Sequence, residues 1–296
     1  MKIFDCFMYF DEDQVLELRL NILNDYVDFF VIVESTYNHK GEKRKLLFDQ
    51  AKFEKFKDKI IYIVYDQIPN KVETINQEDP KKTRDYKYIM NAVYRENSQR
   101  NFIVEGLKNA LENDLILISD VDEIPKLDDL KLNEIGNEIL IFKQDMFYYK
   151  FNLNIPNFKW SGTKGVKMKK LLSPQWLRNV KDRKYPFYRI DTIFSEKKYT
   201  NIKIISDGGW HFSNLKSPEM IEHKLRSYLH HKEFDEASLT IEQIDELIKK
   251  KQAIYDLRVD KRVNKVGNGV VLDNFEIEKL PSYLQKNIEK YKNWID

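Results

Sequence analysis

The chain lacks the features that mark membrane-spanning, disulfide-stabilised and strongly charged proteins. Among 296 residues there is one cysteine, Cys6, so no internal disulfide can form. No stretch approaches the roughly 18 consecutive apolar residues of a membrane span, and the sequence opens as a strand without a signal-peptide pattern. The formal net charge is only +2, too small for the whole molecule to steer a charged partner. We therefore expect a cytoplasmic protein with no membrane span and no nucleic-acid partner.

The chain contains enough apolar residues to build a core. Hydrophobic residues make up 42% of the sequence and charged residues 33%, and the length suits one large α/β domain or one domain with a helical appendage. There is no internal repeat and no low-complexity tract. Because Cys6 lies in an apolar run, we expect a buried structural thiol without chemistry of its own.

The first half of the chain alternates apolar runs with helical patterns. Four runs predict buried strands: 3–7, 29–33, 60–65 and 115–118. Apolar residues at helical spacing predict helices over 15–23 and 95–111, and the polar, lysine-rich stretch 66–90 predicts a loop. Helices between buried strands favour a largely parallel sheet. In such sheets ligands bind beyond the carboxyl ends of the strands.

Three carboxylates follow the fourth apolar run, in the hexapeptide Asp120-Val121-Asp122-Glu123-Ile124-Pro125. Acids at the point where a buried strand meets solvent favour a hard cation. Mn²⁺ or Mg²⁺ takes oxygen ligands, and such sites commonly combine one or two protein carboxylates with the phosphates of a substrate. The pattern therefore indicates a metal-bridged nucleotide diphosphate. The alternative is a solvated turn in which Pro125 ends the strand.

A second cluster, Gly208-Gly209-Trp210-His211-Phe212-Ser213, follows the strand-like run 202–205. Two glycines allow the backbone to approach another segment closely, and the His211 imidazole could complete a metal shell begun by Asp120 and Asp122. The alternative is a packed, hydrogen-bonded histidine beside Trp210.

The second half of the chain has a different character. Residues 139–153 are aromatic and rich in β-forming residues, and the segment 159–189 carries ten basic residues against one acid, Asp182. Such a segment is either a solvated face or a cradle for an anionic donor or acceptor. From Ser217 onwards the pattern is helical and includes a capping box at 240–243. We therefore expect a helical C-terminal region.

Five segments, in their order along the chain, resemble glycosyltransferase family 17: Ile3–Phe7, Glu17–Leu20, Val27–Glu34, Ser119–Pro125 and Gly209–Ser213. The resemblance covers roughly residues 3–233, and the combined segments are far more specific than D-x-D alone. It implies a GT-A-type nucleotide-sugar fold, with a mostly parallel central sheet flanked by helices. We expect a catalytic domain over 1–214 and a helical extension over 215–296 packed on the same domain.

The resemblance also implies roles for particular residues. It makes Asp120 and Asp122 the D-x-D pair, which would hold both the donor and the metal, and His211 the histidine of the family's G-W-H motif. The pair Arg100-Asn101 would lie near the nucleotide, and Glu34 would contact the uridine.

The implied reaction is an inverting transfer from a UDP-sugar to a hydroxyl of a glycan or other acceptor. The sugar would be N-acetylglucosamine or another hexose, and Mn²⁺ or Mg²⁺ would act as a Lewis acid on the leaving diphosphate. A carboxylate must accept the proton of the hydroxyl, and the candidates are Glu233 and Asp145. Two other classes stay open: a non-catalytic nucleotide-sugar-binding or scaffold protein, and a D-x-D phosphatase.

Overall fold

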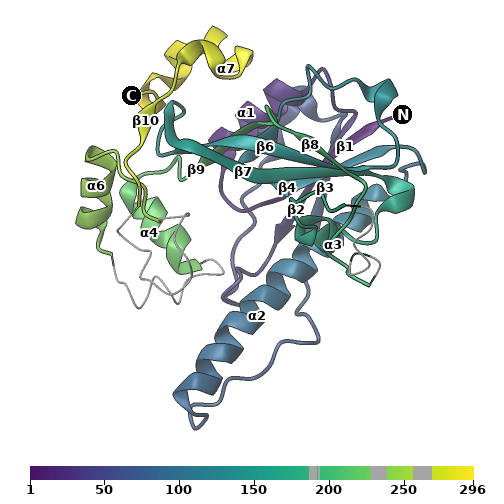
Figure 1. The fold of residues 1–296 in the computed structure, drawn as a ribbon. Helices are drawn as coiled ribbons and strands as arrows, with labels where there is room; N and C mark the ends of the chain where they lie inside the picture. The colour runs from purple at the N-terminus through teal and green to yellow at the C-terminus, as the bar shows by residue number, and fades with distance from the viewer. Residues whose placement is uncertain (187–191, 193, 228–238, 256–268) are drawn as a thin grey trace.

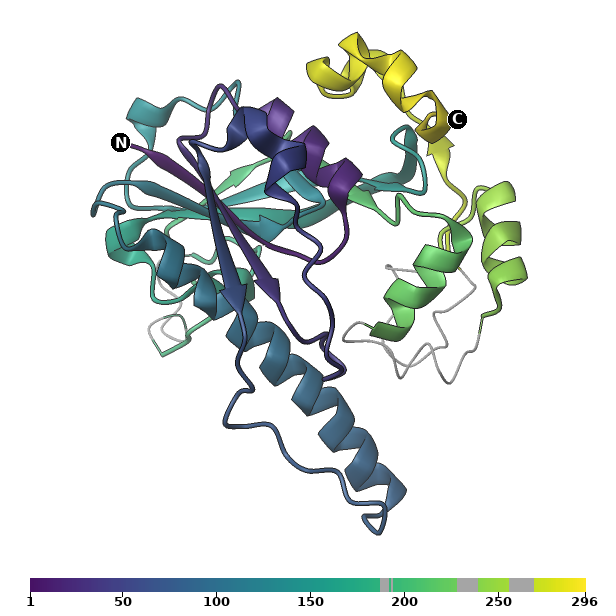
Figure 2. The same ribbon diagram turned by 180° about the vertical axis from the view of Figure 1, so that it is seen from behind.

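The computed structural model describes residues 1–186, 192, 194–227, 239–255 and 269–296. Within them the strands form one mixed sheet, in the order β3-β2-β1-β4-β7-β6-β9-β5. Strand β8 lies beside β6, and β10 lies beside β7. Figures 1 and 2 show the sheet from its two sides, with helices packed on both faces.

The first half of the sheet is parallel. Its strands are β1 (Ile3–Tyr9), β2 (Phe29–Ser35), β3 (Ile60–Tyr65) and β4 (Leu115–Asp120). Strand β1 lies between β2 and β4, and β3 flanks β2. Parallel strands covered on both faces read as nearly continuous apolar runs, which is why the sequence predicted these four. The strand predictions are confirmed, and Cys6 is fully buried.

The second half of the sheet adds antiparallel pairs. Its strands are β5 (Glu123–Pro125), β6 (Ile139–Tyr148), β7 (Leu153–Lys167), β8 (Ile202–Ile205), β9 (Gly209–Ser213) and β10 (Asp273–Asn274). Strand β7 joins the halves by pairing antiparallel with both β4 and β6. Strand β9 runs parallel to β6 and antiparallel to β5. The α/β architecture with a mostly parallel sheet is confirmed, and the GT-A type stays a prediction.

Helical segments lie between and after the strands. The α-helices are α1 (Asp13–Leu23), α2 (Lys81–Asn101), α3 (Pro174–Asn179), α4 (Pro218–Ser227), α6 (Ile241–Lys249) and α7 (Ser282–Lys286). The 3₁₀ segments are Gln50–Phe56, Phe102–Leu107, Leu132–Glu134, Met168–Lys170, Ile277–Lys279 and Ile288–Trp294. None of the helices in the described ranges combines the length and the apolar composition needed to cross a bilayer.

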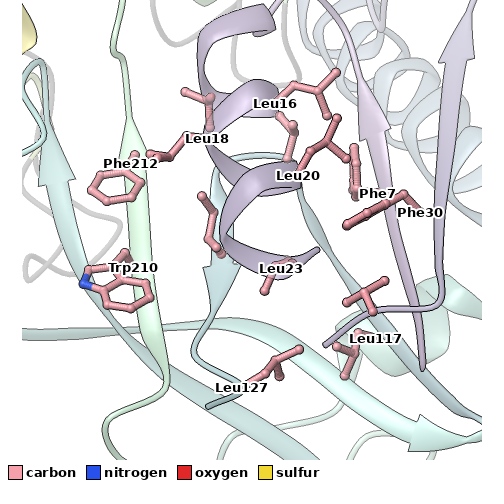
Figure 3. Close-up of a cluster of buried hydrophobic side chains, with 14 of the residues drawn as sticks. Phe7, Leu16, Leu18, Leu20, Leu23, Phe30, Leu117, Leu127, Trp210 and Phe212 are labelled. Carbon is pink, nitrogen blue, oxygen red and sulfur yellow. The ribbon is translucent and has the colours of Figure 1, made fainter. Parts of the chain in front are cut away.

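Helix α1 covers one face of the sheet, and its apolar side forms the centre of the larger core. Leu16, Leu20 and Leu23 are fully buried and belong to one core cluster with Phe7 of β1 and Phe30 of β2 (Figure 3). Each fully buried leucine contributes about 1.5–3 kcal/mol through removal of apolar surface from water. This packing fixes α1 firmly against the strand ends that carry the site.

Helix α2 differs from the prediction. The sequence predicted a loop over 66–90 and a helix over 95–111, whereas α2 begins at Lys81, ends at Asn101 and is followed by a 3₁₀ segment. The outer part of α2 projects away from the sheet (Figures 1 and 2). This outer part contacts the polar segment 73–79, for example through Lys87 and Asp79, and shows no apolar stripe, so periodicity could not reveal it. Pro80 marks its start because proline restricts the backbone without disturbing the helix that follows.

The described residues of the C-terminal region include α4, α6 and α7 and pack against the rest of the chain at two places. Helices α4 and α6 contribute Ile221 and Ile244 to a core with Leu153 of β7. Leu284 of α7 and Tyr291 join the core under α1. The capping box of α6 is present at Thr240. The domain boundary between residues 214 and 215 stays a prediction.

Candidate active site

A cavity of about 300 Å³ opens where β1, β2 and β4 end. Its walls come from the residues that follow these strands, from β9 and from the C-terminal half of α2. Asp120, Asp122, Arg100 and His211 all line it. The carboxyl edge of a parallel sheet exposes strand-end residues where the connections diverge, so a cavity there matches the predicted location.

The acidic hexapeptide 120–125 and the segment 208–213 lie side by side, although they are far apart in the chain. Strand β5 pairs antiparallel with β9 so that Glu123 faces His211 and Pro125 faces Gly209. Gly209 has φ +116°, and a Cβ added to it would lie 2.2 Å from the carbonyl oxygen of Ile124. Only glycine combines that backbone conformation with so close an approach. The glycine therefore seats His211 beside the acidic turn.

Asp122 and His211 form a pair in the cavity. The imidazole Nε2 lies 3.4 Å from Asp122 Oδ1, and both side chains are largely buried. Burial lowers the pKa of His211, but the Asp122 carboxylate outweighs it and the net shift is upward. Burial raises the pKa of Asp122, but His211 brings it below its ordinary value. Each group thus favours the charged form of the other.

Asp120 has a different environment. Arg100 Nη2 donates to Oδ1 at 3.0 Å, and Arg178 Nη2 donates to Oδ2 at 3.1 Å. Burial opposes ionisation of Asp120, but the two guanidinium groups, Arg178 first, hold its pKa well below its usual range. Asp120 is therefore a carboxylate with a cation on each oxygen.

The donor set fits a divalent ion at Asp122 and His211. A carboxylate oxygen and an imidazole nitrogen together suit Mn²⁺, and the buried Nδ1 of His211 has no hydrogen-bond partner in the described structure. No group of three or more His, Cys, Asp or Glu side chains in the described ranges is arranged to hold a metal. The protein thus offers two ligands, and diphosphate oxygens and water would have to supply the rest. The metal contacts of Asp120, Asp122 and His211 stay predictions.

Glu123, the third acid of the hexapeptide, stabilises the turn through hydrogen bonds. It is fully buried and accepts hydrogen bonds from Asp120 N at 2.9 Å, Trp160 Nε1 at 2.6 Å and Arg178 Nη1 at 2.6 Å. Burial lowers the pKa of Arg178, but Glu123 and Asp120 outweigh it and raise the pKa. These contacts fix the direction in which Asp120 points.

The basic segment 159–189 divides into inward and outward residues. Lys164 is buried, and its Nζ donates to the carbonyls of Arg178 and Val180 at the end of α3. Burial and the nearby Arg178 lower the pKa of Lys164 to about 7. Arg178 points to the acidic turn, whereas Lys169, Lys170, Lys181, Arg183 and Lys184 are exposed. Arg189 lies outside the described residues. The exposed residues match the solvated face, and a cradle for an anionic donor or acceptor stays a prediction.

Arg19 of α1 is a residue that the sequence analysis missed. It is fully buried and donates to both carboxylate oxygens of Asp5 and to Ser119 Oγ. Its Nη1 also donates to three carbonyl oxygens of the 120–123 turn, at 2.8–3.1 Å. A lone arginine between Leu18 and Leu20, in a helix with an otherwise apolar face, was the available signal. Arg19 holds the acidic turn on the core.

The predicted Arg100-Asn101 pair divides between two surfaces. Arg100 lines the cavity, and besides Asp120 it contacts Glu96 at 2.8 Å and Gln175 Oε1 at 2.5 Å. Asn101 lies on another side of α2, where its Oδ1 accepts a hydrogen bond from the backbone N–H of Gln175. The structure therefore brings Arg100 to the acidic turn but not Asn101.

Glu34 lies beneath the surface rather than in the cavity wall. Its carboxylate is fully buried, accepts hydrogen bonds from Leu47 N, Phe48 N and Tyr62 Oη, and pairs with Arg44 at 3.0 Å. These partners tie the segment after β2 back onto the sheet. A contact between Glu34 and a sugar donor stays a prediction. In the structure, Glu34 stabilises the segment after β2.

Of the two candidate bases, the structure describes only Asp145, which does not line the cavity. Asp145 is the register partner of Trp210 in β9, whereas Met146 is the partner of His211. Because successive strand residues face opposite sides, Asp145 lies on the face away from His211, where it pairs with Lys159 at 2.8 Å. Glu233 lies outside the described residues.

The chain is similar to known proteins over most of its length. The sequence pattern of glycosyltransferase family 17 matches residues 1–295. The beta-1,4-mannosyl-glycoprotein 4-beta-N-acetylglucosaminyltransferases of Mus musculus and Homo sapiens are each 26% identical to the chain over 235 residues. The alignment covers 73% of this chain but 40% of the mouse protein and 41% of the human protein. The chain thus spans about two fifths of the length of these relatives.

Proposed function

The chain belongs to glycosyltransferase family 17, and on that premise we propose that it transfers a sugar from a UDP-sugar to a hydroxyl of a glycan or other acceptor. N-acetylglucosamine is the first candidate sugar, because the names of the mouse and human relatives specify it. The observation that carries the proposal is the pairing of Asp122 with His211 inside a cavity at the carboxyl ends of parallel strands.

Different residues of the cavity would bind the metal ion and the phosphate oxygens of a nucleotide diphosphate. Asp122 and His211 would hold Mn²⁺ or Mg²⁺, which when bound supplies Lewis-acid stabilisation of the leaving diphosphate. Arg100, with several N–H groups in the cavity wall, would donate charge-assisted hydrogen bonds to phosphate oxygens. Asp120 keeps Arg100 and Arg178 in position for this. The inverting course and the base, Glu233 or Asp145, are part of the proposal.

A panel of nucleotide sugars tests the function. A ligand that binds only the folded state raises the melting temperature, so in the presence of Mn²⁺ one UDP-sugar should raise it more than the others. That donor should then be hydrolysed slowly to UDP, and faster when an acceptor is added, only when Mn²⁺ is present. Hydrolysis of p-nitrophenyl phosphate instead would indicate a phosphatase. Binding of a donor without any turnover would indicate a scaffold protein.

Replacing His211 with alanine tests the metal site directly. Loss of one ligand should raise the Mn²⁺ concentration that half-saturates transfer by about tenfold or more, the scale seen when a metal shell is disturbed. The measurement is activity against Mn²⁺ concentration in wild type and His211→Ala. Trp210→Phe is the control, because it perturbs packing next to His211 on the opposite face. Equal metal dependence in all three proteins would make His211 a packing residue.

A further inference from the structure

The C-terminal half of α2 is a wall between two cavities. On one side is the candidate active site, and on the other a cavity of about 750 Å³ that we call the α2 groove, bounded by α2, α3 and the segment after β3. Two stripes of α2 residues, each with spacings of three or four residues, face the two sides. The active-site stripe consists of Glu96, Gln99 and Arg100. The groove stripe consists of Tyr94, Asn97, Ser98 and Asn101.

The two stripes differ in charge. The active-site stripe carries Glu96 and Arg100, whereas the groove stripe carries no charge. Across the whole groove, six side chains are amides: Gln67, Asn70, Asn97, Asn101, Gln175 and Asn179. Lys71, Glu196 and Lys197 also line it, and all three are exposed. Three of the amides, Gln67, Asn70 and Asn179, are exposed as well, so a ligand held between α2 and α3 would meet the half-buried amides Asn97, Asn101 and Gln175.

Aromatic rings complete the lining. Tyr65, Tyr94 and Trp176 all contribute to it. The indole of Trp176 is held in place, because its Nε1 donates to the hydroxyl of Tyr199 at 2.7 Å and the two rings meet edge to face. The Tyr65 hydroxyl likewise donates to Ser98 Oγ at 2.7 Å. Rings fixed by hydrogen bonds offer apolar surface that needs no reordering when a ligand packs on it.

Some of the polar groups are available to a ligand. Tyr94 and Asn97 are half-buried, and their side chains make no hydrogen bond with any part of the chain that the structure describes. Gln175, by contrast, is held between Arg100 and Asn179. The groove thus combines fixed walls with unused donors and acceptors, and its volume is within the roughly 300–1,000 Å³ of small-ligand sites.

We propose that the α2 groove binds a neutral oligosaccharide. Each sugar hydroxyl both donates and accepts a hydrogen bond, and an amide side chain offers both functions in one group. The C–H faces of sugar rings are apolar and pack on aromatic rings, which Tyr94 and Trp176 supply. An anionic ligand would find cations only at exposed positions, Lys71 and Lys197. The groove therefore selects against charge and for hydroxyl-rich ligands.

Fluorine NMR of the full chain labelled with 5-fluorotryptophan tests this proposal. The chain has four tryptophans, so four resonances are expected, and Trp176→Phe identifies the one from the groove. The probes are N,N′,N″-triacetylchitotriose, mannotriose and maltotriose, with UMP as the nucleotide comparison. At least one trisaccharide should shift the Trp176 resonance saturably while that of Trp294, far along the chain, stays fixed.

Two tyrosines of α2 provide a matched pair of variants. Tyr94→Ala removes a groove residue, whereas Tyr86→Ala removes a tyrosine that is 59% exposed and outside the groove. Tyr94→Ala and Asn97→Ala should each weaken trisaccharide binding about fivefold, the effect of losing one net hydrogen bond. Tyr86→Ala should leave binding unchanged. Melting temperatures of all three variants establish that each is folded.

Three results would overturn the proposal. The first is that no trisaccharide shifts the Trp176 resonance. The second is that UMP shifts this resonance and the sugars do not. The third is that Tyr86→Ala and Tyr94→Ala weaken trisaccharide binding equally. The readout is binding in the absence of donor and metal. Failure of the proposed transferase activity would therefore leave this result standing, and an active transferase could still fail this test.

Discussion

Asn in place of Asp122 is expected to reduce sugar transfer by about three orders of magnitude while the protein stays folded. The substitution keeps the size of the side chain and removes the charge that faces His211. Lewis-acid stabilisation of the leaving group is worth several kcal/mol, and each 1.36 kcal/mol is a factor of about ten in rate. The loss should fall on turnover because the charge on the diphosphate grows in the transition state.

The measurement is turnover at saturating donor over a range of Mn²⁺ concentrations, together with the melting temperature. Asp129→Asn is the matched control: it makes the same chemical change a few residues away, at a side chain that is 80% exposed. Normal turnover of Asp122→Asn at ordinary Mn²⁺ concentration would remove Asp122 from the metal site. A large fall in melting temperature would mean that Asp122 acts mainly in folding.

Methionine in place of Arg19 is expected to lower the free energy of unfolding by about 3–5 kcal/mol, the cost of leaving one partner of a buried ion pair alone. The Asp5 carboxylate is fully buried and has both oxygens bonded to Arg19. The carbonyls of the 120–123 turn would also lose a donor. The turn that carries the two aspartates would then be held less firmly, so activity per folded molecule should fall too.

Urea unfolding measures the change, with stability taken from the midpoint and slope of the transition. Arg183→Met, at an exposed position, is the control and should change stability by less than about 0.5 kcal/mol. The double variant Asp5→Leu/Arg19→Met removes the buried carboxylate as well and should recover part of the loss. A loss below about 1 kcal/mol in Arg19→Met would show that the buried pair adds little.

Apolar periodicity predicted those parts of the fold that are buried on both sides. Strands β1, β2 and β4 and helix α1 follow the sequence pattern because the core buries them, whereas β3 is half-buried at the sheet edge and was predicted from its apolar run. Residues 81–90 escaped prediction because this part of α2 projects from the molecule and shows no apolar stripe. The antiparallel strands after β4 depend on pairings between distant segments, which local patterns do not encode.

The same division holds for the candidate site. The sequence pattern placed Asp122 just after β4 and His211 just after two glycines, and the structure brings these two side chains together. Arg19 could not be predicted, because only the fold reveals that its partners Asp5 and the 120–123 turn are buried with it. The place of Asp145 could not be predicted either, because only the pairing of β6 with β9 shows that Trp210 rather than His211 lies opposite it.

The position of β9 in the chain decides when the site can form during synthesis. Chains emerge from the ribosome N-terminus first, and a nascent chain that has reached residue 208 already holds β1 to β4 and the acidic turn. It lacks His211 and the rest of β9. That strand pairs with β5, and its Phe212 N–H donates a hydrogen bond to the Asp122 carbonyl. Strand β5 therefore has no strand partner until β9 is made, whereas Arg19 of α1 is already present to hold the 120–123 turn. The Asp122–His211 pair therefore cannot form before residue 211 has been made.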